Sequence, residues 1–232
     1  MVSLVIGSII TIGLLVTDQK EFKNADKRDG DIGTSKAELI PWFKQEPPSE
    51  ITKKGWHKVS LILEIVTDPI IQNALKSSNE EFSKMSPSIL EKHMETKEKE
   101  WISATKPTPF MKSVMNNHVA DFLIERTLIS SDEFGDIVFG EHILSNSKGA
   151  NVAVTVRTDN YDQSNDDWWS LANNVGLLIR ECDWDESAQM FSQDIVIRIH
   201  DENDEFLGIM NSATPCDVLE EEFSEVTLDY IF

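Results

Sequence analysis

The sequence is poor in cysteine, with only Cys182 and Cys216 among its 232 residues. Two cysteines are too few for a disulfide framework, and the lack of a Cys-x-x-Cys pair or a Cys/His cluster excludes the usual zinc sites. The two could still pair with each other if the domain lies outside the cytoplasm, where disulfides persist. Both stand at the ends of expected strands, and the sequence leaves their pairing open.

Motifs for catalysis are also missing. The chain has no Gly-rich phosphate loop, no nucleophile elbow and no recognisable Ser/His/Asp or Cys/His set. Carboxylate pairs carry little information among 41 acidic residues. The segment that starts at Asp162 begins like a calcium loop, yet Asp167 and Asn173 replace the glycine and glutamate that such a loop requires. We therefore expect no enzyme activity, no cofactor and no metal site.

Basic residues are scarce in the second half of the chain. The net charge is −20, and from residue 128 onward 23 acidic residues accompany four basic ones, Lys148, Arg157, Arg180 and Arg198. Such a surface repels phosphate, which excludes direct binding of nucleic acid and of anionic lipid headgroups. It can attract metal cations or cationic ligands, although acidic surfaces also keep proteins soluble in salty surroundings.

Long apolar runs are limited to one, residues 1–16, which reads MVSLVIGSIITIGLLV. It is shorter than the roughly 20 residues of a spanning helix. It has the length of a signal-peptide core but lacks a basic leader and a clear cleavage site. Its isolation from the next apolar segment argues against a buried helix. We expect residues 1–17 to be a membrane anchor or signal segment, cleaved or retained, and residues 18–54 to be a polar linker.

Residues 55–232 are expected to form one domain whose hydrophobic pattern changes halfway. Apolar residues recur at helical spacing over residues 56–75, 86–101 and 111–123. Strand-like segments follow at 137–144, 151–156, 176–181, 194–200 and 206–212, with a short helix at 165–174 and a terminal strand or helix at 223–231. This order predicts an α+β fold, a PAS-like five-stranded antiparallel sheet with long N-terminal helices.

Polar and aromatic residues are densest between residues 157 and 187. Two adjacent tryptophans stand there in a polar setting, and paired indoles need burial together with acceptors for their N–H groups. Rings with converging carboxylates and a guanidinium form the kind of wall that a small polar ligand requires. The candidate ligand-binding residues are Arg157, Asp159, Tyr161, Gln163, Trp168, Trp169, Asp183 and Asp185.

In this region the chain resembles the Cache (PDC-like) extracytoplasmic sensor domains. The resemblance rests on SNSKGANVAVT, Arg157-Thr-Asp-x-Tyr-x-Gln, an acidic pair with Trp-Trp, Asp-Glu-Ser and DIVIRIHDENDEFLGIM, within residues 55–215. It implies a PAS-like domain outside the membrane that recognises small molecules and passes strain along its N-terminal helix. Two features are expected to differ from the family: Asp166 replaces an arginine of the amino-acid-binding members, and we expect no transducing domain within the 232 residues.

The roles of the candidate residues leave alternatives open. Arg157 either makes a structural ion pair with the surrounding aspartates or holds a ligand carboxylate. In the second case Asp183 or Asp185 takes an ammonium group, and the tyrosine and glutamine supply neutral hydrogen bonds. Of the two tryptophans, one is expected in the core and one at the ligand.

Three functions compete on these grounds. The first is a membrane-anchored, extracytoplasmic (extracellular) sensor domain that binds an amino acid, an amine or an organic acid. Its partners would be that small-molecule ligand, the membrane through residues 1–16, and a separate signalling protein or a second copy in a homodimer, but no nucleic acid. The second is a structural or assembly protein that uses the domain for protein contact. The third is a hydrolase with paired acids, which the spacing of the carboxylates does not demand. We expect the first.

Overall fold

The computed structural model describes residues 47–134 and 138–228. The expected anchor or signal segment, residues 1–17, and most of the expected linker lie outside these residues, so both assignments stay predictions. No helix within the described ranges combines the length and the apolar character that a membrane crossing needs.

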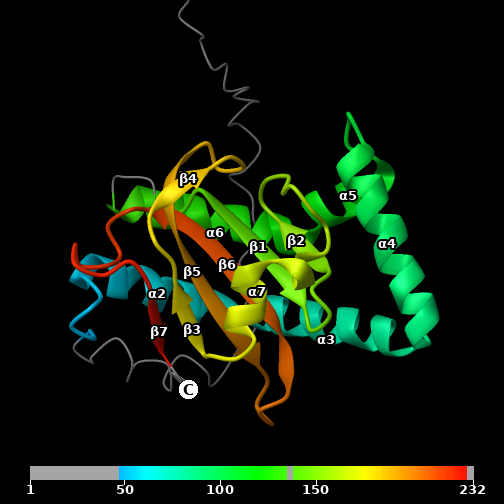
Figure 1. Ribbon diagram of the computed structural model, residues 1–232, viewed down its shortest axis with the longest axis horizontal. Helices are drawn as coiled ribbons and strands as arrows, with labels where there is room; N and C mark the ends of the chain where they lie inside the picture. Colours follow the sequence, from blue (N-terminus) through cyan, green and yellow to red (C-terminus); the bar gives the residue numbers. More distant parts are fainter. Residues whose placement is uncertain (1–46, 135–137, 229–232) are drawn as a thin grey trace, which may run out of the picture. The chain divides into compact units, whose positions relative to one another are not determined.

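The first half of the described chain is helical, as the sequence predicts (Figure 1). Three of its helices begin with a proline, which suits the first turn because its missing N–H would have no partner there. The residues before two of these prolines, Asp68 and Thr108, accept hydrogen bonds from backbone N–H groups of the first turn. The helices are α2 (Lys53–Val66), α3 (Pro69–Ser83), α4 (Pro87–Ser103), α5 (Pro109–Met115) and α6 (His118–Phe134).

A seven-stranded sheet forms the second half, and every strand pair in it is antiparallel. The five predicted strands are confirmed as β1 (Glu141–Asn146), β2 (Asn151–Val154), β3 (Leu177–Ile179), β5 (Met190–His200) and β6 (Phe206–Pro215). They lie in the order β2-β1-β6-β5-β3. Two short strands extend the sheet beyond the predicted five: β7 (Val226–Leu228) pairs with β3, and β4 (Asp183–Asp185) pairs with β5.

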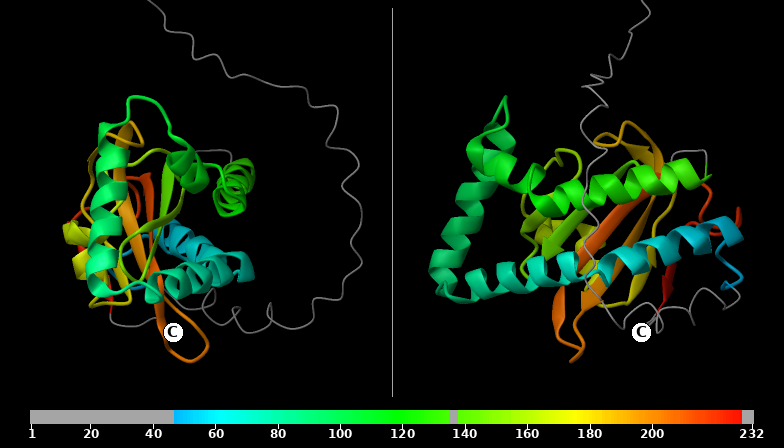
Figure 2. Two further views of the ribbon diagram at one scale, coloured as in Figure 1. Left: turned by 90° about the vertical axis from the view of Figure 1, so that its right-hand side faces the viewer. Right: turned by 180° about the vertical axis from the view of Figure 1, so that it is seen from behind.

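Helices cover both faces of this sheet. Helices α2, α3 and α6 pack on one face, against a cluster that includes Leu177, Ile195 and Ile197. The short helix α7 (Asp167–Ala172) packs on the other face, against Leu178 and Val196. The alternation of Leu177 and Leu178 between the two clusters follows from the two-residue period of a strand. Figure 1 shows α7 in front of the sheet, and the view from behind in Figure 2 shows α2, α3 and α6 over the opposite face.

The folded part of the chain begins earlier than residue 55, the predicted domain boundary. Ile51 is 2% exposed and forms an isolated β-bridge with Leu219. Gly55 lies so close to the chain on the other side that a Cβ atom there would come within 2.3 Å of the Val218 carbonyl oxygen. Residues 51–54, assigned to the linker by their polar composition, therefore belong to the packed domain.

Candidate ligand-binding site

A cavity of about 480 Å³ lies on the α7 face of the sheet, at the end where β4 pairs with β5. Its lining comes from β1, β4, β5 and β6, from the segment that leads into α7, and from α7 itself. Five of the eight candidate residues line it: Asp159, Gln163, Trp168, Asp183 and Asp185. The fold therefore brings together residues from two distant parts of the sequence.

The cavity is strongly acidic. Among its described lining residues the one basic side chain is Arg180, whose Nη1 lies 3.5 Å from Oδ2 of Asp194. That guanidinium already has a carboxylate beside it, so the other acidic residues give the cavity a negative electrostatic potential. The acidic lining residues are Glu141, Asp159, Asp166, Asp167, Glu181, Asp183, Asp185, Glu186 and Asp194. Such a lining attracts cations and repels organic acids.

The floor of the cavity is formed by the sheet. Glu141 of β1 and Asp194 of β5 are both paired with Ala213 of β6, so the three side chains stand in one row on the same face. Glu141 is 5% exposed. Burial, together with the nearby Asp185 charge, raises the pKa of Glu141 to about 8. Burial also raises the pKa of Asp194, although Arg180 acts in the opposite direction.

Glu141 is not among the candidate residues chosen from the sequence, although an acidic residue at the start of an apolar strand could have indicated that it lies in a site. The same holds for Asp194 at the start of the apolar run of β5. Asn211 of β6 also lines the cavity and is 6% exposed. In a strand with alternating side chains, a polar residue on an otherwise apolar face indicates that this part of the face lines a site and does not pack in the core.

One wall of the cavity comes from the segment before α7. Trp168 lines the cavity and is 7% exposed. Gln163 is buried and donates through Nε2 to the carbonyl oxygen of Asn160. Both carboxylate oxygens of Asp166 accept from Nδ2 of Asn160 at 3.1 Å. Burial raises the pKa of Asp166, and the amide of Asn160 opposes that shift. Hydrogen bonds within the segment before α7 therefore fix the shape of this wall.

Three candidate residues, Arg157, Tyr161 and Trp169, do not line this cavity. Arg157 donates to the carbonyl oxygens of Ala104 and Trp101, at 3.0 and 2.6 Å, and so caps the C-terminal end of α4. Its partners are backbone carbonyls, whereas the sequence reasoning expected aspartates or a ligand carboxylate. Helix C-termini carry unsatisfied carbonyls that attract guanidinium groups, and nothing in the local sequence around residue 157 indicates that α4 ends beside it.

Tyr161 and Trp169 are core residues. Tyr161 is 4% exposed and packs against the rings of Trp101 and Phe110, with centroids 6.0 and 5.0 Å away. It borders a different cavity, of about 530 Å³, between β2 and helices α3 to α6. Trp169 donates through Nε1 to Oγ of Ser145 at 3.1 Å and packs with the apolar residues under α7. Both tryptophans belong to the hydrophobic cluster under α7, and of the two Trp168 alone also lines the cavity.

The opposite rim of the cavity is β4. Oδ1 of Asp185 accepts from the backbone N–H groups of Ser187 and Ala188, which fixes the turn that follows the strand. Trp184 is 47% exposed and packs edge-on against Phe191, with centroids 5.4 Å apart. These contacts leave the Asp183 and Asp185 carboxylates at the cavity's edge.

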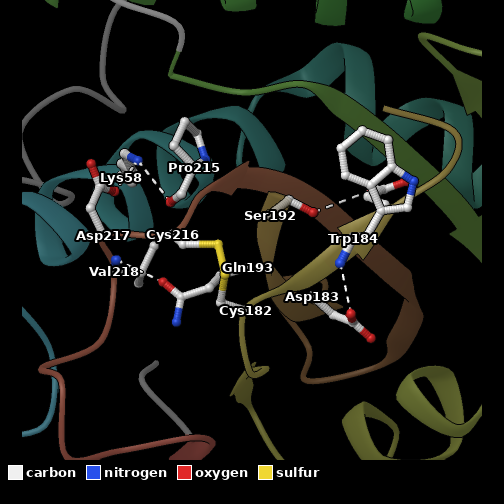
Figure 3. The surroundings of a disulfide bond; sticks show 11 residues. Lys58, Cys182, Asp183, Trp184, Ser192, Gln193, Pro215, Cys216, Asp217 and Val218 are labelled. Carbon is white, nitrogen blue, oxygen red and sulfur yellow. Dashed lines mark hydrogen bonds and ion pairs between the residues drawn. A yellow bond between two sulfur atoms is a disulfide. The ribbon is translucent and has the colours of Figure 1, made fainter. Parts of the chain in front are cut away.

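A disulfide anchors this rim. Cys182, the residue before β4, is bonded to Cys216, just after β6, with the two Cα atoms 5.5 Å apart (Figure 3). The pairing that the sequence left open is therefore present. Next to it, Asp217 forms ion pairs with Lys54 and Lys58 of α2. One covalent bond and one charge cluster thus join the rim of the cavity to the first described helix.

No three His, Cys, Asp or Glu side chains converge closely enough to hold a metal ion in the part of the chain that the structure describes. The cavity acids are spread around the lining, and several already accept protein hydrogen bonds. Asp185 and Asp166, discussed above, are two of them.

No family model matches the chain, and no curated protein matches it. Several solved structures do. The ligand-binding domain of the Campylobacter jejuni chemoreceptor Tlp3, in complex with L-norvaline, matches at 12% identity and a TM-score of 0.33, over 78% of this chain and 59% of that one. The ligand-binding domain of the Pseudomonas fluorescens chemoreceptor CtaA, in complex with L-leucine, matches at 16% and 0.31, over 62% and 59%.

The sensor domain of the V. cholerae histidine kinase DctB matches at 13% identity and a TM-score of 0.29, over 62% of this chain and 56% of that one. The chain therefore spans less than two thirds of the length of each of these structures. Each of these three structures is a ligand-binding or sensor domain, two of them from chemoreceptors and one from a histidine kinase.

Proposed function

We propose that this protein is a sensor domain, without catalytic activity, whose cavity binds a small organic cation that carries an ammonium group. The observation that supports this proposal is the composition of the cavity: nine acidic residues and Arg180 around a space of about 480 Å³, with the Trp168 ring in its wall. A cation gains Coulomb energy from such a lining, and an indole face attracts an ammonium group further.

The charge distribution also ranks the ligands that the sequence left open. An organic acid would meet carboxylates almost everywhere and would have to compete with Asp194 for the single guanidinium. A free amino acid carries one carboxylate that faces the same difficulty. An amine has no such group, and it therefore fits this lining best.

The proposed location is outside the cytoplasm, with residues 1–16 as the membrane anchor or signal. The disulfide supports this location, since such bonds persist in oxidising compartments. The proposed route of the signal is α2, because the Cys182–Cys216 bond and the ion pairs of Asp217 connect it to the rim of the cavity. We propose that a separate signalling protein or a second copy of the chain receives the signal.

A thermal-shift screen of the full chain with primary amines, amino acids and organic acids tests the proposal. A ligand at about 100 times its Kd should add roughly 2.7 kcal/mol to the free energy of unfolding. We expect amines to raise the melting temperature, organic acids to have no effect, and the amine effect to shrink at high salt.

The charge argument is tested by the double variant Asp159→Asn/Asp183→Asn, which removes two charges from the rim of the cavity and should weaken the response to amines. The matched control is Glu91→Gln/Glu95→Gln, which removes two charges from exposed positions on α4 and should leave the response unchanged. If no amine shifts the melting temperature of the unmodified protein, the sensor proposal is wrong and the assembly-protein alternative takes its place.

A further inference from the structure

Two buried acceptors on the cavity floor point to the place where a ligand would be held. Among the described residues, Oε2 of Glu141 and Oδ1 of Asn211 are buried and have no hydrogen-bond partner. Both side chains line the cavity and are more than nine-tenths buried. A buried acceptor without a donor destabilises the folded protein, so a group that donates to both would be stabilised there.

The sheet register makes these two residues diagonal neighbours on one face of the sheet, within reach of a single bound group. Glu141 of β1 pairs with Ala213 of β6, and Asn211 lies two residues before Ala213 on the same face of the same strand. The methyl group of Ala213 fills little space between Glu141 and Asp194, its two cross-strand neighbours. On the cavity floor, Glu141 and Asp194 therefore flank Ala213, and Asn211 lies two residues away on the same face.

The groups that face Glu141 are mostly acidic. Asp185 of β4, Asp194 of β5 and Asp159 from the segment before α7 each act on it by charge, and all three favour its protonated form. The hydroxyl of Ser187 acts in the opposite direction. Arg180 is turned to Asp194, and Trp168 is the neutral wall contributed by α7. A buried acid among like charges holds a proton in an empty cavity at neutral pH.

We propose that Glu141 and Asn211 form the ammonium subsite of the cavity and that a primary amine binds there as Glu141 releases its proton. This inference rests on the proposed function, since it assigns residues and a proton balance to the same cavity. A primary ammonium group has three N–H donors, enough for both unpaired acceptors, whereas a quaternary ammonium group has none.

The proton balance is simple. Before binding, the carboxylic acid of Glu141 is neutral and the amine is a cation in water, because alkyl amines lose their proton near pH 10. After binding, the carboxylate accepts N–H hydrogen bonds from the ammonium group, and the carboxyl proton passes to solvent through the mouth of the cavity. No covalent bond to carbon or nitrogen changes. One cation enters the cavity for each proton that leaves, so the ionised carboxylate of Glu141 is not left as an uncompensated buried charge.

Proton release makes the affinity depend on pH in a defined direction. Below the pKa of Glu141, each rise of one pH unit makes the proton easier to lose, so the affinity should rise by up to about tenfold per unit. Above that pKa the carboxyl group is already ionised and the affinity should level off. Glu141→Gln has no proton to release and should lose most of this dependence.

Infrared difference spectroscopy of the full chain with propylammonium chloride tests the subsite, with tetramethylammonium chloride at equal ionic strength as the comparison. We expect a protonated-carboxyl band that propylammonium removes, that tetramethylammonium leaves in place, and that is absent from Glu141→Gln. Titrations of propylammonium between pH 6 and 8 should show the rise in affinity in the unmodified protein and a much flatter profile in the variant.

The outcomes separate this inference from the proposed function. If propylammonium stabilises the protein but no such band exists, or if Glu141→Gln keeps the full pH dependence, the subsite is wrong and the sensor proposal stands. If tetramethylammonium binds as tightly as propylammonium, the two acceptors do not select the ligand and the subsite is again wrong. If neither cation stabilises the protein at any pH between 6 and 8, both proposals fail. Glu95→Gln, at an exposed position on α4, serves as the matched control for a lost carboxylate.

Discussion

Trp168 and Trp169 are neighbours on α7 but have different surroundings: Trp168 lines the acidic cavity, and Trp169 donates to the Ser145 hydroxyl inside the core. Consecutive residues of a helix point about 100° apart, so one short helix can place one indole in the site and the next under it. Both indoles also belong to the hydrophobic cluster under α7, so the thermal shift given by a ligand, and not stability alone, distinguishes the two residues.

Substitution of each tryptophan should separate the two roles. Trp168→Ala should abolish the thermal shift given by a bound amine, because it removes the aromatic wall of the cavity. Trp169→Phe should lower the free energy of unfolding by about 1 kcal/mol through the lost hydrogen bond and keep the thermal shift. Leu171→Ala, an exposed position of the same helix, is the control. A thermal shift that survives Trp168→Ala would contradict the assignment of the cavity as the binding site.

Arg157 provides a test of whether a candidate residue outside the cavity contributes to binding. Its guanidinium caps α4 through the carbonyl oxygens of Ala104 and Trp101, so Arg157→Ala should destabilise the protein by about 1–3 kcal/mol. The affinity for amines should not change, because the side chain does not line the cavity. Chemical denaturation gives the first quantity and calorimetric titration the second. Lys148→Ala, an exposed cation in a turn, is the control for a lost charge. A large loss of affinity at unchanged stability would restore Arg157 to the site.

The disulfide should contribute both to stability and to the shape of the rim. The bond joins residues 34 apart in sequence, and a loop of that size stabilises a protein by about 3–4 kcal/mol in the chain-entropy model. The double variant Cys182→Ser/Cys216→Ser should lose about that much free energy of unfolding and should also bind amines more weakly, since β4 is released from its anchor. Reductant should destabilise the unmodified protein and leave the double variant unchanged. Equal sensitivity of the two proteins to reductant would show that the bond is not formed in solution.

Hydrophobic pattern was sufficient to predict most of the fold. The five strands expected from the sequence are those with continuous or alternating apolar residues, such as β5 and β6. Strand β4 was missed because Asp183-Trp-Asp185 is short and polar, and its pairing depends on β5 and on the nearby disulfide. For the segment that contains β7 the sequence allows either a strand or a helix, because its three residues form a strand only by pairing with β3.

The site was harder to predict for a physical reason. The segment from residue 157 to 169 has polar and aromatic residues in succession, and which of them point into the cavity depends on α4 and α5. Those helices hold Arg157 and Tyr161 on the other side of the segment. The local sequence does not show how these helices pack against the segment. The floor residue Glu141 lies in a strand far from the dense motif, and only the register of β1 with β6 brings it to the cavity.

The pKa of Glu141 predicts how stability varies with pH in the absence of a ligand. The unfolded chain loses this proton near pH 4.5, whereas the folded protein keeps it until about pH 8. The unfolded state therefore binds fewer protons between these values, and the contribution of Glu141 to stability falls as the pH rises from about 4.5 to 8. Buried His142 has its pKa lowered to about 3 by desolvation, so its contribution is lost in the other direction, as the pH falls below about 6.5.

Glu141→Gln isolates the first effect, since it leaves His142 in place. The variant should be more stable than the unmodified protein at pH 8, by about 2–5 kcal/mol, and the difference should shrink toward pH 5. Urea denaturation at both pH values, with Glu95→Gln as the control, measures this difference. A gap between the two proteins that is the same at pH 5 and pH 8 would mean that Glu141 ionises normally in the folded state, in which case no proton would be available for release to a ligand.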